Sequence, residues 1–306
     1  MDIRQMQYFV CLAQEGNVTR AARRLSIVQP ALSMQIAKLE SSLGKKLFHR
    51  GAQGMTLTPA GETLLQIVDP ILKDIDRAKE TMSQLDGKVS GRVSIGMIAS
   101  AAQSTLPLSS AKIAAHYPEI HLLVCEGYTE SILEWVAASQ LDLAVVNIPQ
   151  RRIMLSTKHI LDEQMMLAHS AAVDLGLPKN VPYTRLAELD VVIPSRRHGL
   201  RRILDDAAAE AGFTLNPRLE IDTLSAISEV VATTGLATVL PGIALQAMLK
   251  DGRIKAHRLQ QPTVVRSLAW VSNPRRLISS AMSAVMNIIT ADLQASAKSA
   301  SRLAAR

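Results

Sequence analysis

The chain has 306 residues, a formal net charge of +7 and an isoelectric point near 9.6. This length predicts about two to three domains, and the positive charge favours an acidic partner such as a nucleic acid. The sequence has no run of eighteen apolar residues and no signal peptide at its start, so we expect a cytoplasmic protein that does not cross a membrane. Cys11 and Cys125 lie in apolar runs and are expected to be buried hydrophobic side chains rather than a disulfide.

The first 45 residues predict three helices. Apolar residues on one face define the first helix, which Gly16 ends, and Thr19 is the expected N-cap of a short second helix. Pro30 suits the first position of a third helix, whose apolar stripe consists of Leu32, Ile36, Leu39 and Leu43. The other side of the third helix presents Pro30, Ser33, Met34 and Lys38, which have no reason to be buried. Two short helices joined by a tight turn are a helix-turn-helix, whose second helix enters the DNA major groove; a helical hairpin in an ordinary core is the alternative.

The flanks of this pattern favour the DNA-binding interpretation. Residues 1–58 carry eight Lys and Arg, Arg20 and Lys38 among them, against three Asp and Glu. Such a basic surface is what phosphate contacts require. Two short extended segments around residues 51–54 predict a hairpin, the wing of a winged helix, with Arg50 at its base for phosphate or the minor groove.

Thr58 and Pro59 are the expected N-cap and first residue of a long helix. Its apolar residues recur every 3.5 positions on average, as in a coiled coil, and they are Leu64, Val68, Ile71, Ile75, Ala78, Met82 and Leu85. We interpret the helix as a dimerisation helix, bent at Pro70; packing of this stripe against the chain's own body is the alternative.

Residues 86–91 are the expected hinge to a second half in which strands alternate with helices. Strands are predicted over residues 92–98, 120–125, 141–147, 191–193, 218–221 and 237–240. Helices are predicted over residues 106–117, 130–138, 199–211 and 224–233. Apolar strands separated by helices imply a sheet that is covered on both faces. Residues 292–306 are rich in Ala and Ser and are expected to be a frayed tail.

Ligands of open α/β sheets bind at the carboxyl ends of strands and against helix N-termini. Hydroxyl groups at such places belong to Ser100, Thr129, Ser195 and Thr223, and Thr129 is an expected N-cap. The alternative is that these residues only cap helices, and His198, in the same segment as Ser195, could equally be a surface residue. Four arginines cluster near a helix start and would favour a carboxylate or phosphate ligand; the alternative is that they are solvated surface side chains. They are Arg196, Arg197, Arg201 and Arg202.

The sequence offers no constellation for catalysis. It contains no nucleophile elbow, no phosphate-binding loop, no dinucleotide-binding glycine pattern and no metal-ligand spacing among its seven histidines. We therefore expect no enzyme, no metal and no cofactor.

The combination of these features resembles the LysR-type transcriptional regulators. The N-terminal match includes Asn-Val-Thr-Arg-Ala-Ala over residues 17–22, Gln-Pro-Ala-Leu-Ser over 29–33 and Leu-Thr-Pro-Ala-Gly over 57–61. Shorter matches occur at residues 8–9, 25, 35–36, 39–40, 43–44, 47–48 and 50. In the second half, residues 95–96, 106–107, 117–118, 141–144, 198–201, 235–237 and 240–241 resemble the family's effector domain. The resemblance is very specific over residues 1–65 and looser beyond.

The resemblance implies a domain plan. It consists of a winged helix-turn-helix over residues 1–58, a linker helix over 59–90 and two α/β subdomains like those of periplasmic binding proteins. Subdomain I would comprise residues 91–162 and 266–306, and subdomain II residues 163–265, with the chain crossing near residues 162 and 266.

The resemblance also implies partners and residue roles. The partners are an inverted-repeat DNA site built around T-N11-A, a small-molecule effector, further copies of the chain in a dimer or tetramer, and RNA polymerase. Gln29, Pro30, Ser33 and Gln35 match the family's contacts to bases and backbone, and Arg50 matches the start of the wing. Ser100, Thr129, Ser195, His198 and Thr223 match positions that line the effector cleft in several members.

Two departures from the family pattern concern DNA contacts. Met34 stands where many members have Arg, and the wing carries no charge between Arg50 and Met55. We predict a sequence-specific transcriptional regulator that is controlled by a small, anionic effector. The alternative is an architectural DNA-binding protein without an effector; a secreted solute-binding protein and an enzyme fit the sequence less well.

Overall fold

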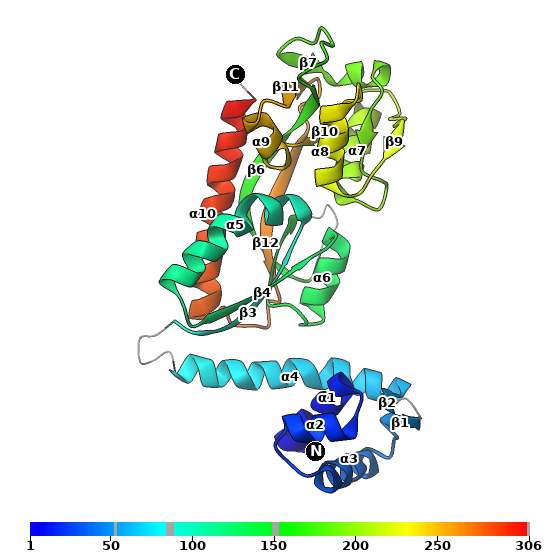
Figure 1. Cartoon of the computed structure of the whole chain (residues 1–306), viewed down its shortest axis with the longest axis vertical. Coiled ribbons are helices and arrows are strands. Elements are labelled where there is room, and N and C mark those ends of the chain that lie inside the picture. The colour runs from blue at the N-terminus through cyan, green and yellow to red at the C-terminus, as the bar shows by residue number, and fades with distance from the viewer. Residues whose placement is uncertain (52–53, 84–88, 149–152, 305–306) are drawn as a thin grey trace. The chain divides into compact units, whose positions relative to one another are not determined.

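The computed structural model describes residues 1–51, 54–83, 89–148 and 153–304, which form two compact units, residues 1–88 and 89–306 (Figure 1). The N-terminal unit contains α1 (Ile3–Glu15), α2 (Val18–Arg24), α3 (Gln29–Leu43), β1 (Phe48–Gly51), β2 (Gly54–Leu57) and α4 (Pro59–Ser83). None of the described helices has the length and hydrophobicity that are needed to span a membrane.

The N-terminal unit is the predicted winged helix-turn-helix with small shifts at its caps. Gly16 ends α1 in the left-handed conformation, with φ of 59°. The N-cap of α2 is Asn17 and not Thr19, because the Asn17 side chain accepts hydrogen bonds from the backbone N–H groups of Thr19 and Arg20. α3 begins at Gln29, so Pro30 occupies its second position. The β1–β2 hairpin is present as predicted, and residues 52–53 at its tip lie outside the described residues.

The hydrophobic core of this unit explains the orientation of α3. Phe9, Leu32, Leu39 and Leu47 are fully buried in it. Burial of the stripe on α3 leaves the opposite side of the helix facing the solvent. Thr58 begins α4 as predicted, because its hydroxyl accepts a hydrogen bond from the Gly61 N–H at 3.0 Å.

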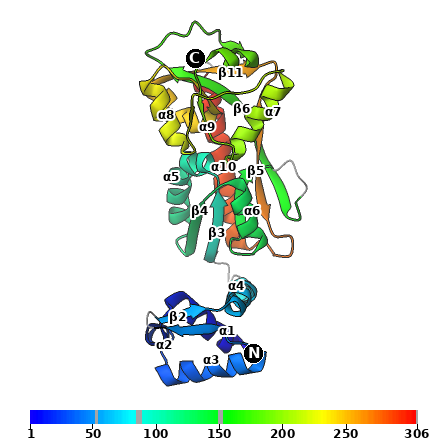
Figure 2. The same ribbon diagram turned by 90° about the vertical axis from the view of Figure 1, so that its right-hand side faces the viewer.

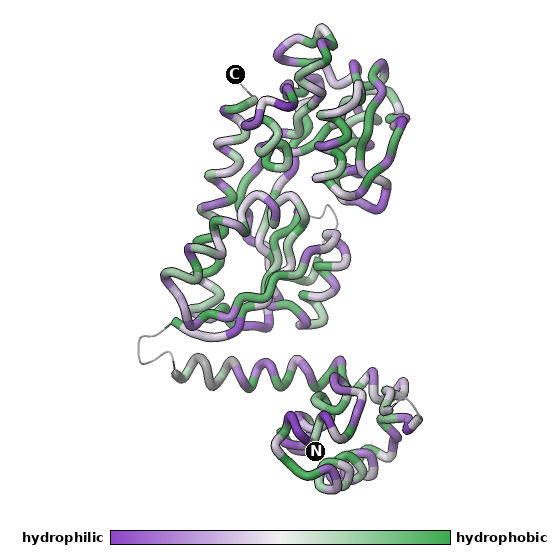
Figure 3. Tube along the Cα trace, in the orientation of Figure 1, coloured by the Kyte–Doolittle hydropathy of each residue, from purple (hydrophilic) through white to green (hydrophobic). Residues whose placement is uncertain are grey.

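The predicted dimer stripe on α4 is divided between two environments. Val68 is 0% exposed because it packs into the core of its own unit, so its assignment to a dimer interface is wrong. Ile71 and Met82 are exposed, at 39% and 65% of their surface, and Leu85 lies outside the described residues. The helix continues through Pro70, and its hydropathy alternates along the part that is coloured in Figure 3.

The C-terminal unit is built on one eight-stranded sheet with the order β4-β3-β5-β12-β6-β11-β7, to which β10 adds by pairing with β6. The strands are β3 (Gly91–Met97), β4 (Ile120–Glu126), β5 (Leu143–Asn147), β6 (Ser156–Ser170), β7 (Asn180–Pro182), β10 (Thr238–Pro241), β11 (Ile254–Gln260) and β12 (Val265–Ser272). A separate parallel pair consists of β8 (Val192–Ile193) and β9 (Leu219–Glu220). The helices are α5 (Ala99–His116), α6 (Thr129–Ala137), the 3-10 helix η2 (Tyr183–Glu188), α7 (Gly199–Glu210), α8 (Leu224–Thr233), α9 (Gly242–Lys250) and α10 (Ser280–Leu303).

Two hydrophobic cores lie along this sheet, one on each side of the place where β6 passes from one to the other (Figure 2). The first contains Val93, Leu143 and Leu268, and the second contains Leu167, Leu204 and Ile227. β6 takes part in both, because its first half pairs with β12 and its second half with β10 and β11. We call the parts around these cores the first and second lobes.

Two predictions for the C-terminal unit are wrong. Residues 292–303 are no frayed tail: they belong to α10, and Leu293 and Ala300 are buried. Asp292 in this helix accepts a hydrogen bond from Ser109 at 2.8 Å and pairs with Lys112, so a polar contact also holds α10 against α5. Secondly, α5 begins at Ala99 and not near Leu106, which places Ser100 inside a helix.

Candidate functional site

The solvent-facing side of α3 carries the residues predicted for base contacts. Gln29, Pro30 and Lys38 are exposed, and the Met34 side chain is 63% exposed. Ser33 and Gln35, also predicted for this surface, are half-buried. The surface is therefore a helix face of mixed polar and apolar groups that protein contacts leave largely free.

Neighbouring helices orient two amides of this surface. The Thr19 hydroxyl donates to Gln29 Oε1 at 3.4 Å, and Gln5 Nε2 donates to Gln35 Oε1 at 3.4 Å. Both bonds leave the amide nitrogens of the two glutamines available as donors. The α2 contact therefore presents the Gln29 amide at the start of α3, where a groove-reading helix makes its base contacts.

Basic side chains flank α3. Arg20 and Arg24 on α2 both pair with Glu15, at 3.5 Å and 2.9 Å. These pairs are solvent-exposed, and exposed ion pairs contribute about 0–1 kcal/mol, so phosphate can compete for the guanidinium groups. Arg50 is exposed on β1, opposite Met55 in the hairpin. The predicted phosphate-binding residues Arg20 and Arg50 are thus accessible to solvent.

A cavity of about 190 Å³ in the C-terminal unit lies where the two lobes meet. The first lobe contributes Ile98, Ala99, Gln103, Glu126, Gly127, Tyr128, Thr129 and Asn147. The second lobe contributes His198, Gly199, Asp222, Thr223 and Leu224. The cavity therefore touches the N-termini of α6, α7 and α8 and the ends of β4 and β5.

Three of the five predicted ligand residues line this cavity, namely Thr129, His198 and Thr223. Ser100 does not, because it is 1% exposed and its hydroxyl accepts a hydrogen bond from Arg266 Nη1 at 2.8 Å. Ser195 is also outside the lining; its backbone N–H donates to Asp222 Oδ1 at 2.9 Å and so positions a wall residue. Residues from the predicted strand ends thus meet at one cavity, but the sequence could not show which hydroxyl groups the fold would use internally.

Two buried polar atoms at the cavity have no hydrogen-bond partner among the described residues: Thr129 Oγ1 and Asn147 Oδ1. Thr129 is the first residue of α6, and the N-cap is Tyr128, so Thr129 does not cap the helix as predicted. A buried polar group without a partner is costly, by roughly 1–3 kcal/mol, which makes these atoms candidates for ligand contacts. Sequence analysis missed Asn147, although it is the final residue of a strand that was predicted.

Gly199 keeps the second lobe close to these atoms. A side chain at this position would put its Cβ 3.6 Å from Asn147 Nδ2 and 3.7 Å from Thr129 Oγ1. The glycine therefore leaves the backbone at the start of α7 open toward both groups. The same three residues also line a neighbouring cavity of about 260 Å³, which Arg202 and Arg266 border.

Polar contacts close one wall of the cavity between the lobes. The Tyr128 hydroxyl donates to Asp222 Oδ2 at 3.1 Å, and the Tyr128 ring meets His198 edge-on, with 5.5 Å between ring centroids. Burial raises the pKa of Asp222, but hydrogen bonds from Ser195 and Tyr128 outweigh it and hold the pKa below its usual value. Burial lowers the pKa of His198, whose ring nitrogen accepts from the Leu200 N–H and caps α7. At neutral pH the wall thus carries an ionised Asp222 and a neutral His198.

A buried ion pair lies where the chain crosses between the lobes. The Arg266 guanidinium on β12 donates to Glu163 Oε2 on β6 at 2.7 Å and 3.0 Å, and its third contact is the Ser100 hydroxyl on α5. Glu163 Oε1 also accepts from the Ile243 N–H, at 2.7 Å, in the first turn of α9. We call Arg266, Glu163 and Ser100 the crossing cluster. It connects helices of both lobes to the two crossing strands.

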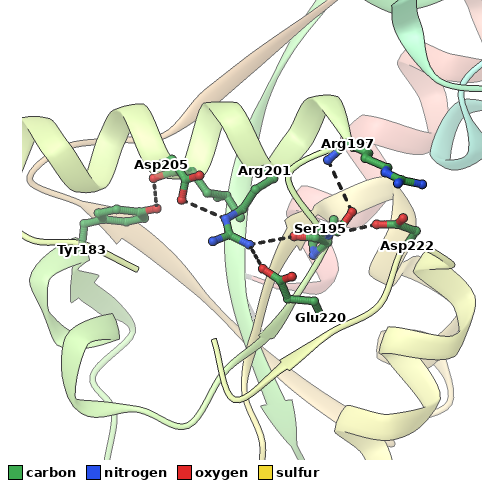
Figure 4. Close-up of polar contacts among 9 residues, drawn as sticks. Tyr183, Ser195, Arg197, Arg201, Asp205, Glu220 and Asp222 are labelled. Carbon is green, nitrogen blue, oxygen red and sulfur yellow. Dashed lines mark hydrogen bonds and ion pairs between the residues drawn. The ribbon is translucent and has the colours of Figure 1, made fainter. Parts of the chain in front are cut away.

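Of the four arginines that were considered for an anion, Arg201 alone is internal (Figure 4), and the other three are exposed. Arg201 is 2% exposed, and it donates to Asp205 at 2.8 Å, to Glu220 and to the carbonyl of Pro194. Arg202 pairs with Glu130 on α6 at 3.4 Å. Arg201 therefore stabilises the second lobe, and its guanidinium is used by contacts within the protein. Arg196 and Arg197 are exposed and do not line the cavity.

The cysteines and potential metal ligands offer no further site. Cys11 is buried, and burial raises the pKa of its thiol; Cys125 packs partly against the first core. Since Cys125 is the single cysteine after residue 88, no disulfide can form within the C-terminal unit. Within the described ranges, no three His, Cys, Asp or Glu side chains gather as a metal site would require.

Comparisons with known proteins agree with this architecture. Residues 3–62 match the model of the "Bacterial regulatory helix-turn-helix protein, lysR family", and residues 86–294 match the "LysR substrate binding domain". The nitrogen assimilation regulatory protein nac of Escherichia coli is 28% identical over 94% of both chains. The hydrogen peroxide-inducible genes activator of Haemophilus influenzae is 27% identical over 90% of this chain and 91% of its own.

Solved structures show the same fold. A full-length OxyR variant from Pseudomonas aeruginosa superposes with a TM-score of 0.73 at 22% identity, over 97% of both chains. Full-length CbnR, solved with its target DNA, superposes with a TM-score of 0.68 at 19% identity, over 97% of this chain and 100% of its own.

Proposed function

Because the chain belongs to the LysR family of transcriptional regulators, we propose that it reads an inverted-repeat promoter site and that a small polar molecule in the cavity between the lobes controls it. Family membership makes the chain a DNA-binding regulator with an effector domain and confirms the prediction that it is no enzyme. The observation that carries the proposal is the free, exposed side of α3 next to accessible arginines. No observation favours an architectural role without an effector.

In this proposal α3 lies in the major groove. Six of its residues contact bases and the DNA backbone, namely Gln29, Pro30, Ser33, Met34, Gln35 and Lys38. Arg20 on α2 and Arg50 at the wing bind phosphates, which fix the register of the helix on the duplex. A side-chain amide such as that of Gln29 can form two hydrogen bonds with adenine, a contact that distinguishes base pairs by about 1–3 kcal/mol.

The proposed oligomeric state is a homodimer or homotetramer, because two half-sites need two copies of α3. Ile71 and Met82 on α4 expose apolar surface that a second copy would cover, and Leu64, Ile75 and Ala78 complete the stripe on this helix. Leu64 packs partly within its own unit, as Val68 does fully. We further propose contact with RNA polymerase and a cytoplasmic location, where its DNA target lies.

Control by an effector requires that the ligand binds two arrangements of the lobes with different affinity. Thr129 and Asn147 belong to the first lobe and His198 and Thr223 to the second, so a ligand that contacts both favours one arrangement. The crossing cluster supports this coupling. Arg266 contacts Ser100, the neighbour of the lining residue Ala99, and it holds Glu163 at the start of α9.

The test is a selection of genomic fragments by the purified protein, followed by footprinting across a salt series. We expect a protected pseudo-palindrome over several helical turns. Gln29→Ala should weaken specific binding by about 1–3 kcal/mol, which is roughly 5- to 150-fold. Ser41→Ala, at an exposed position in the last turn of α3, is the matched control and should bind as the parent does. Protection without sequence preference, or an unchanged footprint in Gln29→Ala, would refute the placement of α3.

A further inference from the structure

The charges that line the cavity between the lobes are acidic. Glu126 and Asp222 contribute carboxylates, and no Lys or Arg occurs among its lining residues in the described chain. The Glu126 side chain makes no hydrogen bond or ion pair with any residue that the structure describes. A ligand that carries only negative charge would therefore face two like charges at short range, which disfavours binding.

Asp222 is held in its ionised form. Its two oxygens accept hydrogen bonds from the Ser195 N–H at 2.9 Å and the Tyr128 hydroxyl at 3.1 Å. Each carboxylate oxygen can accept more than one hydrogen bond. Asp222 and the unpaired Glu126 therefore leave acceptor capacity for a cationic donor such as an ammonium group.

The part of the cavity around Thr129 and Asn147, in contrast, favours a negatively charged group. Both side chains are more than nine-tenths buried, and each has a polar atom without a partner in the described chain. The N-termini of α6 and the twelve-residue α7 adjoin them, because Thr129 is the first residue of α6 and Gly199 the first of α7. Helix N-termini carry partial positive charge and free N–H groups, and they favour a carboxylate. The Thr129 hydroxyl and the Asn147 amide nitrogen can each donate a hydrogen bond to it, whereas the unpartnered Asn147 oxygen can only accept.

We infer that this cavity binds a zwitterion with a carboxylate and an ammonium group, as in a small α-amino acid, and this inference rests on the proposed function. The carboxylate lies against Thr129, Asn147 and the start of α7, and the ammonium group lies against Glu126 and Asp222. Leu224 and Ile98 supply apolar surface for a short side chain. The sequence led us to expect an anionic ligand. In this inference the carboxylate supplies the negative charge, and helix N-termini bind it instead of the arginines.

The inference explains why the unpartnered Thr129 hydroxyl is retained, because its O–H can donate to the carboxylate of the ligand. Thr129 and Asn147 are in the first lobe, whereas Gly199 and Asp222 are in the second. A ligand with both groups makes contacts to both lobes, as regulation through their arrangement requires.

The experiment uses the full-length protein and the twenty standard L-amino acids, each at the same concentration, in a thermal-shift assay followed by calorimetry. For the amino acid that raises Tm most, the probes are its deaminated analogue, which keeps the carboxylate, and its decarboxylated analogue, which keeps the ammonium group. We expect the amino acid to bind and both analogues to bind about tenfold or more weakly. Absence of binding by any amino acid would overturn the inference, and so would equal binding of the deaminated analogue.

Two variants and one control locate the two halves of the ligand. Glu126→Gln should weaken binding of the amino acid about tenfold, with little effect on the deaminated analogue. Thr129→Val should weaken both. The matched control is Glu134→Gln, at an exposed position of α6 away from the cavity, and it should bind as the parent does. An unchanged affinity in Glu126→Gln would contradict the assigned ammonium position.

DNA footprinting with and without the bound probe separates this inference from the proposed function. An amino acid that binds in the cavity without changing the footprint supports the ligand class and refutes control by the cavity. A carboxylic acid without an ammonium group that binds there and changes the footprint supports control and refutes the ligand class.

Discussion

The two units of this regulator present the side chains of the proposed sites in opposite ways. In the N-terminal unit, Gln29, Met34 and Arg50 are exposed, and contacts within the protein leave them largely free. In the C-terminal unit, Thr129, His198 and Asp222 lie in a cavity between two lobes, and the last two also hold structural hydrogen bonds. Substitutions on an exposed DNA-binding surface should affect DNA affinity with little effect on folding stability. Substitutions in the cavity wall should affect both ligand affinity and folding stability.

This comparison predicts the largest effect at the crossing cluster. Arg266→Met removes the partner of the buried Glu163 carboxylate and should lower the free energy of unfolding by about 3–5 kcal/mol, as measured by urea denaturation. Adding Glu163→Gln should recover part of the loss, since the amide oxygen can still accept from the Ile243 N–H. The exposed control Arg196→Ala should stay within about 0.5 kcal/mol of the parent. A loss equally small in Arg266→Met would show that the cluster is not structural.

The next effect concerns the cap of α2 and tests the corrected helix boundary. Asn17→Ala leaves the N–H groups of Thr19 and Arg20 without an acceptor and should cost about 0.5–2 kcal/mol of unfolding free energy. Thr19→Ala loses only an exposed contact to Gln29 and should cost clearly less. Denaturation curves of the two variants decide the matter, and a larger loss in Thr19→Ala would restore Thr19 as the cap.

A smaller effect should appear in the pH dependence of the C-terminal unit. Burial lowers the pKa of His198, so below about pH 6.5, the usual value for an unfolded histidine, the unfolded chain binds more protons and stability falls. His198→Asn keeps a side chain that can cap α7 and should lose less stability between pH 7 and pH 5.5 than the parent does. Burial also lowers the pKa of His169, so part of the decline should remain. Parallel stability–pH curves for parent and variant would disprove this role of His198.

The smallest change in stability is expected at the DNA surface. Met34→Arg should leave unfolding within about 0.5 kcal/mol of the parent, because Met34 is exposed. If the new guanidinium contacts a phosphate, the slope of log K against log salt should steepen by about 0.9. Met154→Arg, on an exposed methionine of the C-terminal unit, is the matched control and should leave the slope unchanged. A destabilised Met34→Arg variant would contradict the difference between the two units.

The same difference explains what sequence alone could predict. The helix-turn-helix depends on contacts between neighbours in the chain, so the spacing of Leu32, Ile36 and Leu39 sufficed to orient α3. The cavity is assembled from five distant segments, and whether Ser100 faces a ligand depends on Arg266, which is 166 residues away. Its hydroxyl was therefore assigned to the ligand, although the crossing cluster uses it.

Two predictions were wrong although the sequence contained a pattern that bears on each of them. The Ala- and Ser-rich end of α10 was taken for a tail, yet its buried residues Val285, Ile289, Leu293, Ser296 and Ala300 recur at helical spacing. Val68 belongs to a regular seven-residue repeat, but the repeat does not say which chain covers it. Periodicity identifies a face that must be covered and leaves the identity of the cover to the tertiary structure.

α10 has a mechanical consequence for the effector domain. It is a continuous helix without glycine or proline from Ser280 to Leu303, and it runs beside both lobes (Figures 1 and 2). Val285 and Leu293 anchor it in the first core, and Ala304, just beyond it, lies in the second. Near its end Ala300 packs closely on Gly242 of α9, because a Cβ added at Gly242 would lie only 3.2 Å from the Ala300 Cβ. Because α10 and the residue after it pack into both cores, this one rigid element links the two lobes and opposes their separation.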